Sequence, residues 1–71
     1  MKYMVVIEKG KTGYGAHVPD LPGCIAAGET QEEVLELIKG TIKFHIEGLV
    51  ESGEPVPHPS SVSEIIEVCA A

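Results

Sequence analysis

The fold is decided by Val18-Pro-Asp-Leu-Pro-Gly-Cys24, a stretch that stops one strand and prepares the next. Each proline lacks the backbone N–H that a β-ladder needs, so a strand that leads into Pro19 must end there. Pro22 and Gly23 suit the two central positions of a type II turn, the second of which requires a positive φ. The stretch therefore predicts a turn between two strands.

Residues with strand-forming side chains lie on both sides of this turn. Before it, residues 2–9 and 14–18 predict two antiparallel strands joined by the glycine-containing loop 10–13, and after it residues 24–28 predict a third strand. Alternation divides the first strand into two largely apolar faces, with Tyr3, Val5 and Ile7 on one and Met4, Val6 and Glu8 on the other. We therefore expect the first strand to be central in its sheet.

A helix is expected to follow the third strand. Thr30-Gln-Glu-Glu33 reads as a capping box, in which the threonine hydroxyl accepts a hydrogen bond from the N3 amide and Glu33 reaches back to the cap. Apolar residues recur at helical spacing over an arc of about 120°, and they are Val34, Leu35, Ile38, Ile42, His45, Ile46 and Leu49. The helix should end near Ser52-Gly53, because the proline-broken stretch 54–59 cannot continue it.

A fourth strand is predicted over residues 62–70, which are again rich in valine and isoleucine. The element order is then βββαβ, an α+β fold. A right-handed crossover through the helix allows the last strand to lie parallel to the first, beside a three-stranded antiparallel meander with the helix on one face. We expect residues 1–71 to form a single domain, because this length supports one core and no more.

The composition indicates a small folded protein that needs support beyond its core. Of its 71 residues 44% are hydrophobic, which places it outside the disordered class. Cys24 and Cys69 are too few for the disulfide framework of a secreted domain, and the N-terminus does not read as a signal sequence, so a cytoplasmic location is expected. No apolar run is long enough to span a membrane. Self-association is the expected support.

Two surfaces are candidates for that self-association. Leu37 and Phe44 fall outside the main apolar arc of the helix, with the small residues Thr41 and Gly48 beside them. The alternative is that the buried arc is simply wider. The second candidate is the sheet face away from the helix, with Met4 and Val6. Either surface would make the protein a homodimer or a higher homo-oligomer.

The charge is concentrated in the second half of the chain. The net charge is −6, and from Phe44 onward the sequence has no lysine or arginine and five acids, Glu47, Glu51, Glu54, Glu64 and Glu67. Nucleic-acid binders neutralise phosphates with clustered basic residues, so five lysines and no arginine argue against that role. A basic protein partner fits better, although the acids could equally serve solubility alone.

No arrangement of reactive residues predicts catalysis. Gly10-Lys-Thr12 lacks the earlier glycine and the following helix of a phosphate-binding P-loop. His17, His45 and His58 have no partners at metal-ligand spacing, and Ser60-Ser61 lies outside any nucleophile elbow. We therefore expect no catalytic residue, no metal site and no cofactor.

The sequence resembles the HicB antitoxin family from about residue 3 to residue 57. The most specific part is the Val18–Cys24 stretch followed by Gly28-Glu-Thr30 and the Glu32-Glu33 pair. The positions that carry the family motif are Pro19, Asp20, Leu21, Pro22, Gly23, Cys24, Gly28, Thr30 and Glu33.

This resemblance implies a partial ribonuclease H-like fold and a non-enzymatic protein that binds and neutralises a HicA-type toxin, a small basic ribonuclease that cleaves mRNA. The five acids of the second half are the candidates for facing that toxin. Many family members also have a C-terminal DNA-binding module, and because nothing follows the predicted fourth strand we do not expect DNA binding. The alternatives are a binding or regulatory module without a toxin, and a residual metal-dependent ribonuclease with His17 and scattered acids as its only candidates.

Overall fold

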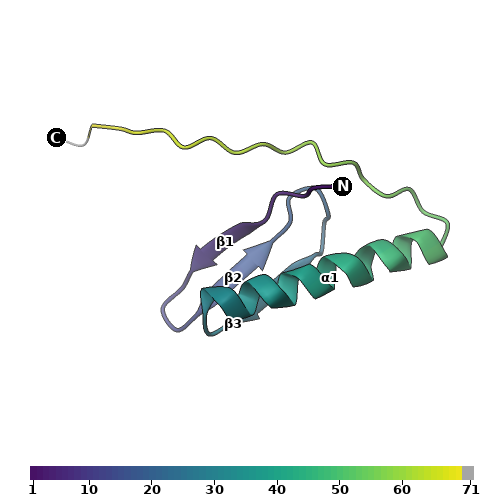
Figure 1. Cartoon of the computed structure of the whole chain (residues 1–71), viewed down its shortest axis with the longest axis horizontal. Helices are drawn as coiled ribbons and strands as arrows, with labels where there is room; N and C mark the ends of the chain where they lie inside the picture. The colour runs from purple at the N-terminus through teal and green to yellow at the C-terminus, as the bar shows by residue number, and fades with distance from the viewer. Residues whose placement is uncertain (70–71) are drawn as a thin grey trace.

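The computed structural model describes residues 1–69 as a three-stranded sheet covered by one helix (Figure 1). The elements are β1 (Val6–Lys9), β2 (Tyr14–His17), β3 (Ile25–Gly28) and α1 (Gln31–Glu51). The strands pair antiparallel in the order β1-β2-β3. The α+β class, the three-stranded antiparallel meander and the helix that follows it are confirmed.

The loop between β2 and β3 is a pair of consecutive tight turns. The Leu21 amide donates to the Val18 carbonyl at 3.0 Å, and the Cys24 amide donates to the Leu21 carbonyl at 3.0 Å. Gly23 has a φ of 85°, the positive value that the second central position of a type II turn requires. The Val18 amide donates to the Cys24 carbonyl at 3.2 Å and closes the loop. The predicted turn is confirmed.

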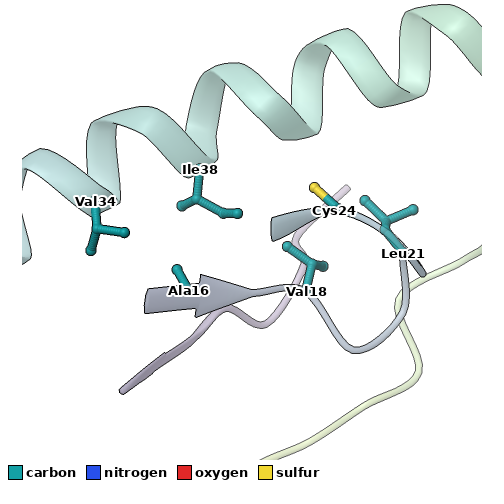
Figure 2. Packing of buried hydrophobic residues seen from close by; sticks show 6 residues of the cluster. All are labelled: Ala16, Val18, Leu21, Cys24, Val34 and Ile38. Atoms are coloured by element: carbon teal, nitrogen blue, oxygen red, sulfur yellow. The ribbon is translucent and has the colours of Figure 1, made fainter. Parts of the chain in front are cut away.

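This double turn also supplies half of the core. The buried cluster contains Ala16, Val18, Leu21, Cys24, Val34 and Ile38, and Figure 2 shows the side chains of the loop pointing toward the helix. The half-buried side chains of Tyr3, Val5 and Ile7 pack against the same cluster, as their shared face predicts. Sheet and helix are therefore joined by the loop as well as by the strands.

Both ends of α1 are capped, and of the predicted capping box the Thr30 half is confirmed. The Thr30 hydroxyl accepts a hydrogen bond from the Glu33 amide at 3.0 Å. The Glu33 side chain does not return a bond to the cap, and its Cγ lies 3.3 Å from the point where a Cβ on Gly28 would stand. At the other end Gly53 has a φ of 72°, and the Glu54 amide donates to the Leu49 carbonyl at 2.9 Å. This bond is typical of the Schellman motif.

The helix extends past the sheet, and its burial is therefore uneven. At 1.5 Å per residue its 21 residues span about 30 Å, whereas a four-residue strand spans about 13 Å. Only Val34 and Ile38 are buried on α1. Further along, Ile42 and Ile46 are half-buried against the core. Leu35 is exposed, so the apolar arc drawn from the sequence is too wide at that position.

The predicted first strand is wrong in its start and in its place in the sheet. Val6 pairs with His17, so Met4 would stand opposite Pro19, which has no amide to donate. The ladder therefore begins at Val6 rather than at residue 2. Within residues 1–69, β1 is also an edge strand with β2 at the centre, because no fourth strand lies beside it.

The predicted fourth strand is wrong over residues 62–69, which are extended without a paired strand, and residue 70 lies outside the described residues. The tail is held to the body before this segment, by a hydrogen bond from the Tyr3 hydroxyl to the Pro57 carbonyl and by bonds from Ser60 and Ser61 to Asp20. Within residues 62–69 the large apolar side chains are all exposed, so their burial does not offset the entropy cost of ordering a strand. The ribonuclease H-like fold, which needs this strand, stays a prediction.

Alanine substitutions at two glycines should change the free energy of unfolding in opposite directions. Gly23→Ala should lower the free energy of unfolding by about 1–2 kcal/mol, because a Cβ is unfavourable at positive φ. Gly40→Ala, in the middle of α1 with open space around its Cα, should raise it by about 1 kcal/mol. Urea denaturation of both variants measures the two changes, and equal effects would contradict the left-handed conformation of Gly23.

Candidate functional site

Asp20, at the outer side of the double turn, is one of two residues, with Tyr3, whose side chains hold the tail to the body. Its carboxylate accepts hydrogen bonds from the Ser60 amide at 3.1 Å and the Ser60 hydroxyl at 3.0 Å. It also accepts from the Ser61 amide at 3.1 Å and the Ser61 hydroxyl at 2.9 Å. We call this arrangement of Asp20, Ser60 and Ser61 the tail clasp. It joins residues 40 positions apart in the sequence.

The clasp favours the ionised form of Asp20. The hydrogen bond donated by the Ser61 backbone is the largest cause that lowers the pKa of Asp20 from its ordinary value of 3.8, and the other clasp donors act in the same direction. Hydrogen bonds to a carboxylate stabilise its charged form. The tail is therefore held most firmly when Asp20 is charged.

The remaining motif residues have structural roles. Leu21 and Cys24 belong to the core, and burial raises the pKa of the Cys24 thiol, which disfavours the reactive thiolate. Thr30 caps the helix. Gly28 has no side chain, and a Cβ placed on it would lie only 3.2 Å from the Val34 amide nitrogen, so glycine allows the helix to start close to β3. The motif thus builds the double turn and the start of α1, and Asp20 alone reaches outward to another segment.

The helix carries an exposed apolar surface. Leu37 is 46% exposed and Phe44 is 79% exposed, which confirms that these two side chains lie outside the buried face. Thr41 lies between them and donates its hydroxyl to the Leu37 carbonyl at 2.9 Å. A Cβ on Gly48 would meet nothing within 4 Å, so the neighbouring surface is open. We call Leu37, Thr41, Phe44 and Gly48 the helix face.

The sheet surface away from α1 is a second open area. Val6 pairs with His17, which pairs with Ile25, so these side chains form one row on that side. Glu8 lies diagonally across from His17, with its carboxylate 4.0 Å from Nδ1. The surface forms a wide, shallow hollow of about 960 Å³ that includes the β1–β2 loop. Met4, placed with Val6 by the sequence, is half-buried and precedes the ladder.

The five candidate toxin-facing acids are all exposed, but they do not form one surface. Glu47 and Glu51 lie in the C-terminal part of α1, and Glu54 follows it closely. Glu64 and Glu67 lie on the tail, which runs back along the molecule so that its last segment lies far from the helix end (Figure 1). The acids therefore divide into a helix-end group and a tail pair.

Two further observations bear on chemistry and location. Among residues 1–69, no group of three or more histidine, cysteine, aspartate or glutamate side chains is arranged to hold a metal ion. In the same range, no helix combines the length and apolar character needed to cross a membrane.

Comparison with known proteins accounts for the motif. The family described as HicB_like antitoxin of bacterial toxin-antitoxin system matches residues 3–69. The chain belongs to this HicB-like antitoxin family. The match extends past residue 57 and includes both clasp serines and most of the tail.

Relatives of the HicB-like chain occur in a phage, an archaeon and a bacterium. An uncharacterised 14.9 kDa protein of Haemophilus phage HP1 is 42% identical over 66 residues, covering 93% of this chain and 50% of the phage protein. A UPF0150 protein of Thermoplasma acidophilum is 42% identical over 62 residues, covering 86% and 90%. Antitoxin HicB 2 of Photorhabdus laumondii is 31% identical over 72 residues, covering 100% and 52%. The chain thus spans about half of two of these relatives.

A solved structure supports the same family at the level of the fold. One chain of a HicA3 and HicB3 toxin–antitoxin complex superimposes with a TM-score of 0.66 at 31% identity, covering 82% of this chain and 72% of that one. The HicB-like assignment therefore rests on sequence and on three-dimensional arrangement together.

Two contacts of the HicB-like fold are not predicted by the sequence. The tail clasp joins a turn aspartate to two serines that carry no distinctive pattern, and the Tyr3 hydroxyl bonds the Pro57 carbonyl across 54 positions. An aspartate in a tight turn usually bonds its own backbone, which gives no signal for a distant partner. These contacts fix the path of the tail.

The tail clasp should open at low pH. A folded-state pKa below the ordinary value of 3.8 means that the clasp stabilises the fold above pH 3.8 and that this contribution is lost as the pH falls through the lowered pKa. The amide resonances of Ser60 and Ser61, followed by NMR from pH 6 to pH 2, should move to open-chain values only below pH 3.8. Asp20→Asn should weaken the clasp at every pH. Ser60 and Ser61 amide shifts that respond neither to the fall in pH nor to Asp20→Asn would contradict the tail clasp.

Proposed function

We propose that this HicB-like protein is an antitoxin that binds a HicA-type toxin and neutralises it by covering its surface. The observation that carries the proposal is the 31% identity and TM-score of 0.66 to a chain of a HicA3 and HicB3 toxin–antitoxin complex. The role of the protein is then to bind in a fixed ratio, without turnover.

The helix-end acids support a basic partner. A helix C-terminus carries partial negative charge, so lysine or arginine is favoured there. α1 has no basic residue in its last turn, and Glu51 stands at its end with Glu54 just beyond. This placement costs the free protein about 0.3–1 kcal/mol for an acid in the last turn. A cationic partner surface would offset that cost on binding.

The helix face lies on the same helix and supplies the apolar part of the proposed contact. Phe44 is one turn of helix from Glu47 and two turns from Glu51, so an exposed aromatic ring is flanked by carboxylates. Interfaces commonly combine a large apolar anchor with a charged rim that speeds encounter. We assign Leu37 and Phe44 as the anchor, and Glu47, Glu51 and Glu54 as the rim.

The direct test is co-expression with the HicA-type toxin encoded beside the gene. A tagged 71-residue chain should restore growth of cells that make the toxin, and the two proteins should co-purify in a constant ratio. Phe44→Glu should fold but fail to rescue, because it places a charge at the centre of the anchor. Persistent growth arrest with abundant, folded wild-type chain would refute the proposal.

Removing the rim charges should slow association with the toxin while making the free protein more stable. The triple variant Glu47→Gln, Glu51→Gln, Glu54→Gln should bind the toxin with an association rate constant lower by roughly 10-fold at low salt, and the difference should disappear at high salt. The free energy of unfolding should rise by about 0.3–1 kcal/mol, because an unfavourable charge leaves the helix end. Stopped-flow binding and urea denaturation measure the two effects.

The matched control removes three charges from outside the rim, two of them at the other end of the helix. Glu29→Gln and Glu32→Gln at that end, with Glu8→Gln on β1, together give the same net charge as the rim variant, and they should leave the association rate near that of the wild type. Equal slowing by both triple variants would mean that total charge, not the rim, attracts the partner.

A further inference from the structure

The end of the tail is the most exposed apolar segment of the protein. The exposed fractions are 84% for Val62, 100% for Ile65, 79% for Ile66 and 82% for Val68. An exposed cluster of large apolar side chains on a soluble domain marks an interaction site or an aggregation risk. We call residues 62–69 the tail segment.

The tail segment has the character of a β-strand without a partner. Valine and isoleucine favour strands, and when the backbone is extended one face carries Val62, Ile66 and Val68 together with one acid, Glu64. No part of the chain between residues 1 and 69 pairs with its backbone. Unpaired amides and carbonyls in an extended apolar segment are ready to extend another sheet.

The tail clasp fixes where this segment starts and where it points. Asp20 holds Ser60 and Ser61, and Tyr3 holds Pro57, so the segment begins at a defined place beside the start of the sheet. From there the tail continues past β1 and away from the body, as the yellow end of Figure 1 shows. Its large apolar side chains consequently remain largely in solvent.

The tail segment could pair with either edge strand of a sheet, β1 or β3, and the charges near these two strands differ. The tail segment contains Glu64 and Glu67 and no basic residue. In and around β1 the chain carries three lysines, Lys2, Lys9 and Lys11, against one acid, Glu8. After β3 it carries the acids Glu29, Glu32 and Glu33. Opposite charges attract across paired strands and like charges repel, so β1 is the complementary edge.

We infer that the tail segment adds to the β1 edge of a second copy of this chain and that the exchange is reciprocal. Each β1 then gains a neighbouring strand, and the exposed Ile66 and Val68 of each tail segment pack against the other copy. A reciprocal exchange obeys two-fold symmetry and closes after two chains, so β1 of each copy is no longer an edge strand. The partner is a copy of the same chain, and the inference does not depend on the proposed toxin.

The helix face is a poorer candidate for self-association. At about 100° per residue, Glu33, Glu36, Glu47 and Glu51 all project within about 100° of Leu37 on one side of α1, where Lys43, at about 120°, is the one lysine. Two copies of the helix face packed together would place these carboxylates against each other. That arrangement repels an identical surface and leaves the helix face to a partner of opposite charge.

A charge placed in the tail segment should dissociate the dimer. Ile66→Lys with Val68→Lys should weaken self-association by at least ~100-fold, because two buried apolar side chains become charged. Light scattering on the full chain should then give a monomer mass at concentrations where the wild type is a dimer. Phe44→Lys, an equally exposed apolar position on α1, should stay dimeric.

The identity of the edge is tested by mixing isotope-labelled and unlabelled chains. Isotope-filtered NMR should show contacts from the tail segment of one copy to β1 of the other. A monomeric wild type, contacts confined to a single chain, or dissociation by Phe44→Lys but not by the tail variant would each overturn the inference.

Discussion

The hydrogen bond from the Val18 amide to the Cys24 carbonyl closes the loop on which the rest of the protein depends. Within seven residues, two tight turns reverse the chain between β2 and β3. The same turns bury Val18, Leu21 and Cys24 under the helix. A sheet of four-residue strands has little surface of its own, so the loop contributes as much to the core as any strand. Its outer residue, Asp20, then holds the tail.

This organisation separates the part of the protein that folds from the parts that can bind. Folding uses the double turn, the inner sheet face and the first half of α1. The outward side of α1 carries the helix face, and the C-terminal end of α1, which extends beyond the sheet, carries the helix-end acids. The tail leaves the body at the clasp with its apolar residues in solvent. Toxin binding and self-association are therefore assigned to different surfaces, and a dimer could present two helix faces at once.

Features determined by neighbouring residues were predictable from the sequence. The type II turn at Pro22-Gly23, the cap at Thr30 and the helix end at Gly53 all follow from local backbone chemistry, and the structure has them as expected. Helical periodicity places Leu37 and Phe44 either on an exposed patch or on a wider buried arc, and the structure has them exposed. The family motif was recognised from its residues, although its structural role became clear only with the double turn.

Features determined by distant or external partners were not predictable in this way. Val, Ile and alternation indicate that residues 62–69 favour an extended strand, but they do not say which edge receives it, and so the expected pairing with β1 of the same chain was wrong. The prediction that β1 is the central strand was wrong for the same reason, because it depended on the fourth strand. The tail clasp joins Asp20 to serines 40 and 41 positions away, a relation that no local pattern encodes.

The most direct measurement of the central claim, that this HicB-like chain works by stoichiometric binding, is a titration of RNA cleavage by the purified HicA-type toxin. With toxin fixed well above the dissociation constant, cleavage should fall linearly as chain is added and should cease at a fixed molar ratio. Cleavage that continues unchanged at a large molar excess of folded chain would contradict the account, as would complete inhibition by a small fraction of an equivalent.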